Sequence, residues 1–267
     1  MKKSALLLIV TQLAAWMLCS PVGLAARHER VSDEVHDIPP GTAVRVLNTN
    51  GAVSVKQWDD PRLRVHAVIR TDKKETEPLD VELSIGMEED TFVVKVTNKK
   101  TVTRDSVELA IDVPAHAVIG EVYTDNGAIL LDGTDDETRL KTGNGKITIE
   151  NVNGAVSAET GNGAIEVAGT REIRSLRTSN GAISADIASV GSDVSIDTLN
   201  GAVTLRLQKG LDLDIECITH NGSIKYDSSM FESLTTDTRT RLMAVMGNGG
   251  SMLHARTNNG RITLEER

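Results

Sequence analysis

The carboxylates are the side chains of this sequence best suited to catalysis, and the reaction they would catalyse is the cleavage of a polysaccharide. Such a site needs clustered carboxylates with a metal ion or a basic partner. The acidic residues gather at Asp59-Asp60, Glu88-Glu89-Asp90, Asp135-Asp136-Glu137, Asp212/Asp214 and Glu265-Glu266. All but Asp212 and Asp214 are contiguous runs, which are typical of solvated turns. We therefore expect no catalytic residue among them.

The sequence also lacks a pattern that would bind a metal ion or a cofactor. Only His28 and His36 lie near each other, in a segment that we expect to be a flexible linker, and the other histidines are His66, His116, His220 and His254. There is no Gly-x-Ser-x-Gly motif and no glycine motif for phosphates or dinucleotides. We therefore predict no metal site and no cofactor, and the binding residues stay unknown.

Cys217 is the remaining candidate nucleophile. The equivalent position of the other repeats described below is apolar, being Val122, Leu140, Ala158, Leu176, Ile196 or Ala255. A small buried hydrophobic residue is therefore favoured over a reactive thiol. Because the only other cysteine is Cys19, in the predicted signal peptide, we expect no internal disulfide.

Residues 1–26 have the layout of a secretory signal peptide. A pair of lysines precedes an apolar run that ends at Leu18 and is shorter than the roughly 20 residues of a membrane-spanning helix. We predict cleavage after Ala25 or Ala26. A lipid anchor on Cys19 is the alternative, and Leu18 disfavours it because a lipoprotein signal has a small residue there. The protein is thus predicted to be exported, to a periplasmic, extracellular or envelope-associated location, with no transmembrane segment in the mature chain.

The charge of the chain excludes some partners. The chain has 29 basic and 38 acidic side chains, and removal of residues 1–26 changes the net formal charge from −9 to −11. An acidic protein repels nucleic acids and anionic membrane surfaces. We therefore expect no nucleic-acid partner, and we expect a monomer.

A repeated Thr-x-Asn-Gly motif sets the architecture. In each copy the third residue after asparagine is β-branched, as in Ile147 and Ile165, and the residue two positions later is apolar. A recurring period of about 20 residues marks a repeat fold whose units pack mainly on their neighbours. The repeat residues are Thr124, Asn126, Gly127, Thr142, Asn144, Gly145, Thr160, Asn162, Gly163, Thr178, Asn180, Gly181, Thr198, Asn200, Gly201, Thr219, Asn221, Gly222, Thr257, Asn259 and Gly260.

The alternation of apolar and polar residues around each Asn-Gly pair predicts two short strands joined by a corner. We attribute the pair to backbone corners, because glycine and asparagine enter left-handed conformations at least cost. A two-residue hairpin is the alternative interpretation. The phased copies, with a second glycine near each midpoint, favour a short-coil, all-β solenoid that resembles a parallel β-helix. Ile147, Ile165 and Ile183 should then stack as one internal column, and Thr142, Thr160 and Thr178 as another.

The predicted domains follow from where this pattern begins and breaks. The signal peptide (1–26) and a flexible linker (27–40) precede a β-rich, partly antiparallel cap (41–123), which holds an isolated first copy of the motif at Asn50-Gly51. The solenoid repeats occupy 124–267, with an irregular insertion or short helix over about 227–247. We expect the charges of the last residues, Glu265-Glu266-Arg267, to protect the open edge of the final strand.

The segment Val44–Trp58, the strand ending at Pro114 and the serial Thr-x-Asn-Gly coils resemble the bacterial putative-adhesin domain family over residues 41–267. The resemblance implies an exported, β-solenoid-like protein associated with the cell envelope. It implies no catalytic or ligand-binding residues, since none are established for the family.

Two functions remain open at this point. The first is a non-catalytic envelope or surface protein, adhesin-like, that binds or scaffolds a polymer or protein partner with its repeated face. The second is a polysaccharide-active enzyme on the same scaffold. Aromatic residues, which often form the platforms of sugar sites, make up only 2% of the chain. That scarcity counts against both the enzyme and a lectin that stacks sugars on aromatic rings, and we favour the first function.

Overall fold

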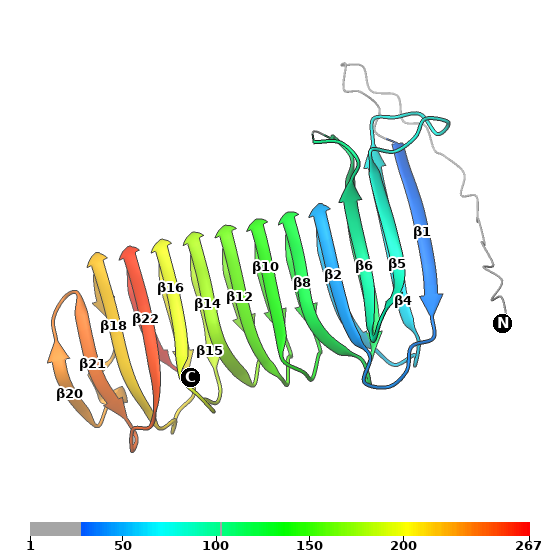
Figure 1. Cartoon of the computed structure of the whole chain (residues 1–267). Coiled ribbons are helices and arrows are strands. Elements are labelled where there is room, and N and C mark those ends of the chain that lie inside the picture. The colour runs from blue at the N-terminus through cyan, green and yellow to red at the C-terminus, as the bar shows by residue number, and fades with distance from the viewer. Residues whose placement is uncertain (1–27, 102) are drawn as a thin grey trace.

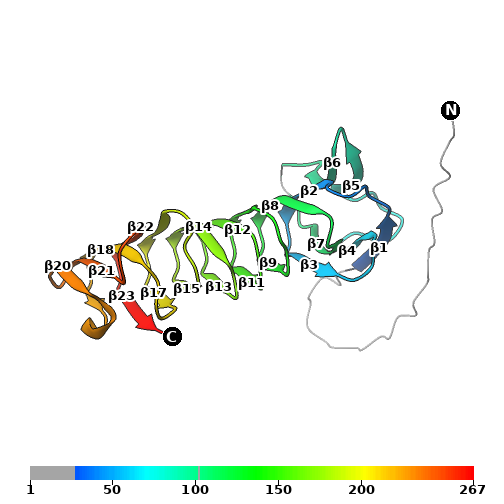
Figure 2. The same ribbon diagram turned by 90° about the horizontal axis from the view of Figure 1, so that it is seen from below.

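The computed structural model describes residues 28–101 and 103–267, and it is a β-solenoid of two long sheets lying face to face (Figures 1 and 2). Sheet A has 11 strands in the order β1-β4-β7-β3-β9-β11-β13-β15-β17-β23-β19. Sheet B has 12 strands in the order β20-β21-β18-β22-β16-β14-β12-β10-β8-β2-β6-β5. The predicted all-β solenoid is therefore confirmed.

The strands are short, and a single 3-10 turn accompanies them among the described residues. Sheet A comprises β1 (His28–His36), β4 (Leu63–Thr71), β7 (Ser106–Pro114), β3 (Val53–Trp58), β9 (Ile129–Asp132), β11 (Ile147–Glu150), β13 (Ile165–Ala168), β15 (Ile183–Ile187), β17 (Val203–Leu207), β23 (Ile262–Glu266) and β19 (Ile224–Lys225). Sheet B comprises β20 (Ser233–Asp237), β21 (Arg241–Met246), β18 (Leu213–Asn221), β22 (Ser251–Asn259), β16 (Val194–Asn200), β14 (Glu172–Asn180), β12 (Ala155–Asn162), β10 (Thr138–Asn144), β8 (Val118–Asn126), β2 (Ala43–Asn50), β6 (Thr91–Asn98) and β5 (Val81–Glu88). The 3-10 turn is η1 (Ser228–Met230).

Each Asn-Gly pair of the repeated motif carries the chain from sheet B to sheet A, so the hairpin alternative is wrong. Asn162 ends β12 in sheet B, and Ile165 begins β13 in sheet A. Successive coils pair in parallel and in register, with Ile147 opposite Ile165 and Ile165 opposite Ile183. These isoleucines are at most 1% exposed, which places the predicted column inside the stack.

The core between the sheets is thin and almost entirely aliphatic. Its wall in sheet B includes a second buried column that contains Thr142, Thr160 and Thr178, as the repeat pattern predicts. Phe92 is the one aromatic side chain among the largest fully buried residues of the described chain. Short side chains suit this core because the two sheets of each coil lie close together.

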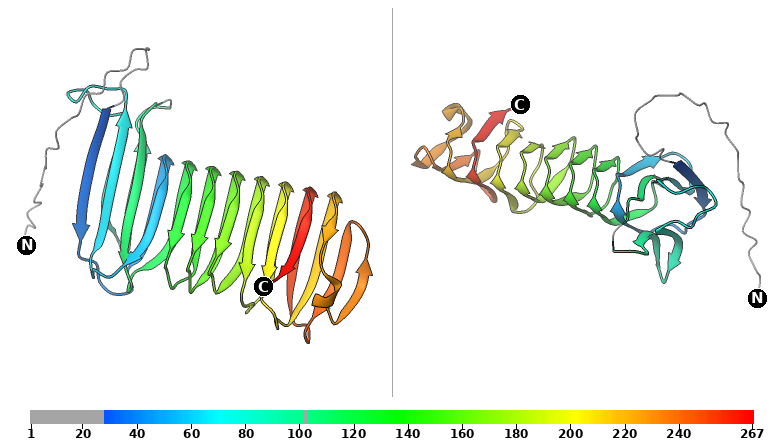
Figure 3. Two further views of the ribbon diagram at one scale, coloured as in Figure 1. Left: turned by 180° about the vertical axis from the view of Figure 1, so that it is seen from behind. Right: turned by 90° about the horizontal axis from the view of Figure 1, so that it is seen from above.

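The first copy of the motif belongs to the stack, although the sequence assigned it to the cap. Strand β2 pairs in parallel with β8, and β3 pairs with β9, so Asn50 lies opposite Asn126. The chain between these two coils folds outward and forms the cap, in which β4 and β7 extend sheet A while β5 and β6 extend sheet B. The cap is partly antiparallel, as expected (Figure 3).

The predicted flexible linker over residues 27–40 is wrong, because most of it is strand β1, which pairs antiparallel with β4 along its whole length. Its strand character is hard to detect because the half-buried side, formed by Arg30, Ser32, Glu34 and His36, is polar. The apolar residues Val31 and Val35 point outward and are 62% and 47% exposed. The predicted signal peptide, with Cys19 and the cleavage site, lies outside the described residues.

The carboxy-terminal coils stack out of sequence order. Strand β22 lies between β16 and β18, and β23 lies between β17 and β19 (Figure 1). The insertion over 227–247 forms η1 and the antiparallel strands β20 and β21, which cover the outer edge of β18. Strand β23 is thus not the last strand of sheet A, but β19 pairs only with its residues Ile262 and Thr263. The charged residues Glu265 and Glu266 lie beside the part of this edge that β19 leaves uncovered, so their protective role stays a prediction.

Candidate functional site

The repeated asparagines form a ladder along one side of the stack. Each Asn Nδ2 donates to the Oδ1 of the asparagine in the adjacent coil at 2.7 to 3.0 Å. The rungs follow the spatial order Asn50, Asn126, Asn144, Asn162, Asn180, Asn200, Asn259 and Asn221. Although these side chains are largely exposed, one donor and one acceptor of each internal rung are already used within the ladder.

The repeated threonines tie the same coils together from inside. Each Thr Oγ1 donates to a glycine carbonyl of the adjacent coil at 2.9 to 3.2 Å, as from Thr160 to Gly145. In the first coil Asn48 takes the place of threonine, and its Nδ2 donates to the carbonyls of Val107 and Gly51. The threonines are buried, so they are closed to a ligand.

The repeated glycines are required by close approach between coils. A Cβ atom added to Gly163 would lie 1.9 Å from the carbonyl oxygen of Gly145, and the other repeat glycines from Gly127 onward meet the same obstacle at 1.8 to 2.0 Å. The expectation of a left-handed backbone is wrong for these positions, since Gly51 alone among the motif glycines has positive φ. Left-handed residues lie at the opposite corner instead, at Gly133, Asn151 and Gly169.

The outward side of sheet A carries an evenly spaced row of short side chains. This outer row consists of Leu130, Thr148, Glu166, Ser184, Thr204 and Thr263, which are paired in register from β9 to β23. All of them are at least partly exposed. Neighbouring members lie roughly 4.8 Å apart because they belong to adjacent strands. The outer row is therefore a regular surface that a long molecule can follow.

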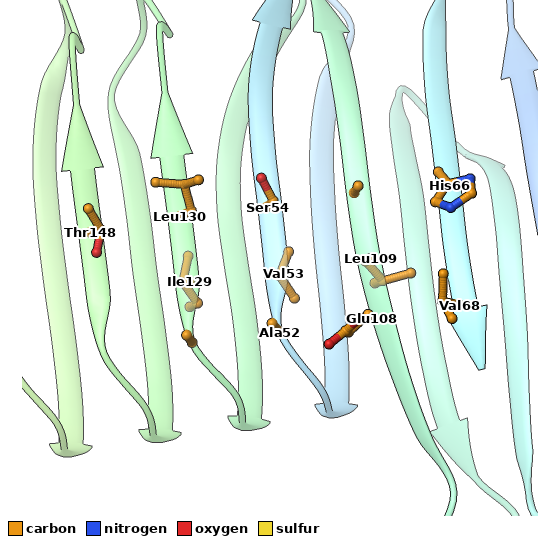
Figure 4. A pocket seen from close by; sticks show the side chains of 12 residues that line it. Ala52, Val53, Ser54, His66, Val68, Glu108, Leu109, Ile129, Leu130 and Thr148 are labelled. Carbon is orange, nitrogen blue, oxygen red and sulfur yellow. The ribbon is translucent and has the colours of Figure 1, made fainter. Parts of the chain in front are cut away.

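A hollow of about 440 Å³ opens on this side of sheet A, where the first coils meet the cap (Figure 4). Its exposed lining is mainly apolar, with Ala52, Val68, Ala110 and Leu130. Of its two ionisable lining residues, Glu108 pairs with Arg70 at 2.7 Å. The other, His66, has its Nδ1 buried at 3.7 Å from Asp33, without a hydrogen bond. The hollow offers apolar contact area and no cluster of free acids.

A second pocket, of about 320 Å³, lies at the corner opposite the asparagine ladder. We call it the corner pocket, and its lining residues are Gln57, Trp58, Asp59, Gly133, Asp135 and Asn151. The lining is mainly polar, with two carboxylates, two amides and one indole ring. Sequence reasoning missed this pocket because its residues come from three coils, the first of which is separated from the next by the whole cap.

The densest charge cluster lies outside sheet B, around Glu216 of β18. Its carboxylate lies 3.0 Å from Arg241, 3.0 Å from His254 and 3.3 Å from Arg256. Desolvation by burial acts to raise the pKa of Glu216, but the hydrogen bonds from Arg256, Arg241 and His254 outweigh it and lower the pKa below its usual 4.5. The cluster joins β18, β21 and β22, and it leaves no free acid for catalysis.

The acidic pairs singled out in the sequence have local structural roles or lie in turns. Asp212 accepts a hydrogen bond from the backbone N–H of Asn248 at 2.7 Å, and Asp214 accepts one from Gly250 at 3.3 Å, so both hold the turn before β22. Burial raises the pKa of the Cys217 thiol to about 12, which keeps it protonated at neutral pH. The structure thus places Cys217 in the core.

The described residues contain no group of three or more His, Cys, Asp or Glu side chains that could hold a metal ion. His28 and His36 lie at opposite ends of β1. Within residues 28–101 and 103–267, no helix is long and apolar enough to cross a membrane.

Several solved structures are similar to this chain. A "putative adhesin" from Parabacteroides merdae is 11% identical, with a TM-score of 0.41, and the match covers 89% of this chain and 96% of that one. A "putative adhesin" from Bacteroides fragilis is 10% identical, with a TM-score of 0.40 and coverage of 89% and 97%. A "putative cell adhesion protein" from Clostridium sporogenes is 9% identical, with a TM-score of 0.37 and coverage of 89% and 100%.

A comparison with curated proteins finds no match. A family model does match, over residues 101–265, which is more than half of the chain and includes all seven copies of the Thr-x-Asn-Gly motif. The match confirms the family resemblance seen in the sequence. The chain belongs to the Toastrack DUF4097 family.

Proposed function

We propose that this protein is an exported, non-catalytic protein of the cell envelope, which binds or scaffolds a polymer or protein partner along its repeated face. The observation that carries the proposal is the outer row, in which Glu166, Ser184 and Thr204 lie in register on three adjacent strands. Many weak, equivalent contacts to such a row gain strength through multivalency. A rigid stack also reduces the entropy lost when an extended partner binds.

The buried ionisable groups support binding in preference to catalysis. Catalysis needs an acid, a base or a nucleophile converging on one pocket. Here Glu216 is held by three basic side chains, and the thiol of Cys217 is buried. Asp186, another largely buried carboxylate, is paired with Arg206 and Arg267. These groups join neighbouring strands or lie in the core.

The test is retention of the purified protein on insoluble envelope polysaccharides and peptidoglycan. Glu166→Ala, Ser184→Ala and Thr204→Ala, made singly, in pairs and together, should weaken retention stepwise, with no single substitution abolishing it. The matched control is the triple alanine variant of Ser157, Ser175 and Ser195, which form an equivalent in-register row outside sheet B. The control should bind like the unmodified protein.

The same incubations decide between binding and the alternative of a polysaccharide-active enzyme. Reaction products should be absent from the supernatant. Reproducible turnover that disappears when one carboxylate is replaced would overturn the proposal in favour of the enzyme. Loss of retention in the sheet B control, equal to that in the outer-row variant, would show that the outer row is not the binding face.

Export needs its own test. The amino terminus of protein recovered from fractionated cells should be Ala26 or Arg27, and the protein should be found outside the cytoplasm. An intact amino terminus, or a lipid on Cys19, would show that residues 1–26 are not a cleaved secretory signal.

A further inference from the structure

The corner pocket is built across three successive coils. Gln57, Trp58 and Asp59 come from the end of β3, Gly133 and Asp135 follow β9, and Asn151 follows β11. Because β3, β9 and β11 are neighbours in sheet A, Trp58 and Asn151 stand about two strand spacings apart, roughly 10 Å. The pocket therefore has two walls, with the middle coil between them.

The floor of the pocket is open because the middle coil has no side chain at the critical position. Gly133, Asn151 and Gly169 occupy the same corner of successive coils with φ of 75°, 55° and 63°. Of these three residues only Asn151 carries a side chain, and asparagine is among the residues that tolerate a left-handed backbone best. A hollow thus forms at Gly133, between the side chains of Gln57 and Asn151, and Trp58 lines it next to Gln57.

Both walls are held in place without a ligand. The indole Nε1 of Trp58 donates to the carbonyl of Arg62 at 2.8 Å, which fixes the plane of the half-buried ring. The amide Nδ2 of Asn151 donates to Asp132 at 3.0 Å, and its backbone N–H donates to Ala168 at 3.1 Å. Preorganised side chains lose little entropy when a ligand binds.

The polar groups of the pocket suit a molecule rich in hydroxyl groups. Asp59 and Asp135 receive no hydrogen bond from another residue of the described chain, so their oxygens can accept from a ligand, and the amides of Gln57 and Asn151 can both donate and accept. An indole presents a broad apolar face beside these groups. One apolar face with hydroxyl groups around its rim describes a sugar ring.

Size and charge narrow the class of sugar. A volume of about 320 Å³ lies at the small end of ligand pockets, which span ~300–1,000 Å³, and it suits a single ring. The two free carboxylates, with Asp132 close by, repel uronic acids and phosphorylated sugars.

We propose that the corner pocket is a subsite for one uncharged hexose ring, with Trp58 as its stacking platform and with Asp59, Asp135, Gln57 and Asn151 as its hydrogen-bonding groups. The inference rests on the proposed function in one respect, since it identifies the polymer that binds along the outer row as a glycan. Trp58 lies on the same side of β3 as Ser54, which is paired with Leu130 of the outer row. A glycan held at the corner pocket can therefore continue along sheet A.

Tryptophan fluorescence offers a direct test, because the chain has only two tryptophans, Trp16 and Trp58. In the full chain carrying Trp16→Phe, titration with cellobiose or with N,N′-diacetylchitobiose should change the emission of Trp58 saturably for at least one of them. A digalacturonate should produce no change. The absence of a saturable response to every uncharged disaccharide would overturn the proposal.

Substitutions distinguish binding in the corner pocket from binding elsewhere on the surface. The measurement is calorimetric titration with the disaccharide that changes the emission of Trp58. Gly133→Asn places a side chain on the floor in a conformation that Asn151 already adopts in the next coil, and it should weaken binding at least tenfold. Trp58→Ala should do the same, whereas Trp58→Phe, which keeps a ring, should retain more affinity. Ser157→Ala, outside sheet B, is the control and should leave binding unchanged.

Asp135→Asn and Asn151→Ala provide a second route if Gly133→Asn fails to fold, as judged by its unfolding transition. Affinity unchanged in all folded pocket variants would overturn the proposal. The retention experiments on the outer row are independent of this result. If retention depends on the outer row but the emission of Trp58 does not change with any disaccharide, the subsite is refuted and the proposed function is retained. A responsive Trp58 without retention would support the subsite and refute the extended binding face.

Discussion

Gly163→Ala probes the close approach of coils on which the stack depends. The added Cβ would lie 1.9 Å from the oxygen and 2.5 Å from the carbon of the Gly145 carbonyl. Real Cβ atoms essentially never come within 3.0 Å of such atoms, so the two coils must separate by about 1 Å or more at this corner. Gly163 does not have a positive φ, so alanine brings no backbone strain of its own.

The magnitude follows from the contacts that this separation disturbs. The displaced carbonyl of Gly145 accepts from Thr160 Oγ1 at 3.0 Å, and the N–H of Gly145 donates to Asn162 at 2.9 Å. Each hydrogen bond contributes about 0.5–1.5 kcal/mol. Overpacking itself costs about 1–3 kcal/mol. The free energy of unfolding should therefore fall by about 2–6 kcal/mol.

Urea unfolding followed by circular dichroism measures this loss. With a denaturant slope of about 3 kcal/mol/M, the midpoint should fall by about 1–2 M. The matched control is Gly120→Ala in β8, where the added Cβ would lie 3.9 Å from the nearest atom, the carbonyl oxygen of Val44. The control should change the free energy of unfolding by less than about 1 kcal/mol, in the stabilising direction. Equal stabilities of the two variants would refute the argument that close approach requires glycine at this corner.

Three further measurements test other parts of the structure. Asn162→Ala removes two exposed hydrogen bonds of the ladder and should lower the free energy of unfolding by about 1–2 kcal/mol, measured in the same urea titration. Because the pKa of Glu216 is lowered in the fold, its contribution to stability is present above pH 4.5 and is lost as the pH falls through its folded pKa. Thermal unfolding of Glu216→Gln should therefore differ from that of the unmodified protein at pH 7, and the gap should narrow below pH 4.5. Burial raises the pKa of Cys217 to about 12, so an aromatic disulfide reagent at pH 8 should label this thiol only at the rate of unfolding. In urea the same thiol should be labelled rapidly. Rapid labelling of the folded protein would contradict the burial of Cys217.

The repeat could be derived from the sequence because local pattern and global fold agree there. The phase of Ile147, Ile165 and Ile183 is the same in every coil, and a solenoid is the arrangement that stacks them. The role of glycine at the Asn-Gly corner was harder to derive. A turn-forming dipeptide suggests a special backbone conformation, whereas the actual constraint is a carbonyl of the neighbouring coil, which a single sequence does not place.

Strand β1 escaped prediction for a different reason. The pattern of β1 puts polar side chains on its half-buried side, so its hydrophobic periodicity is the reverse of an ordinary strand. The corner pocket was equally hidden. Nothing in the spacing of Trp58, Gly133 and Asn151 brings them together until β3 is known to pair with β9.

The order of the last coils could not be read from the sequence either. The copies at Asn221 and Asn259 carry the same motif, and each would fit next to the coil of Asn200. In the structure, the coil of Asn259 lies next to the coil of Asn200. The antiparallel partner β21 pairs with the outer edge of β18, so the edge facing β16 is the one left for the returning strand β22.

This exchange of order affects how the chain can assemble as it is synthesised. In a solenoid whose coils stack in sequence order, each newly synthesised coil can pair at once with the preceding coil, which has already folded. Here β18 is synthesised before β22, the strand that joins it to the stack. The antiparallel pair of β18 and β21 therefore remains detached from β16 and β17, whose edges are still exposed. Those edges are closed only when residues 251–266 arrive. A chain interrupted before that point would present two unpaired strand edges, of β16 and β17, at which it could aggregate.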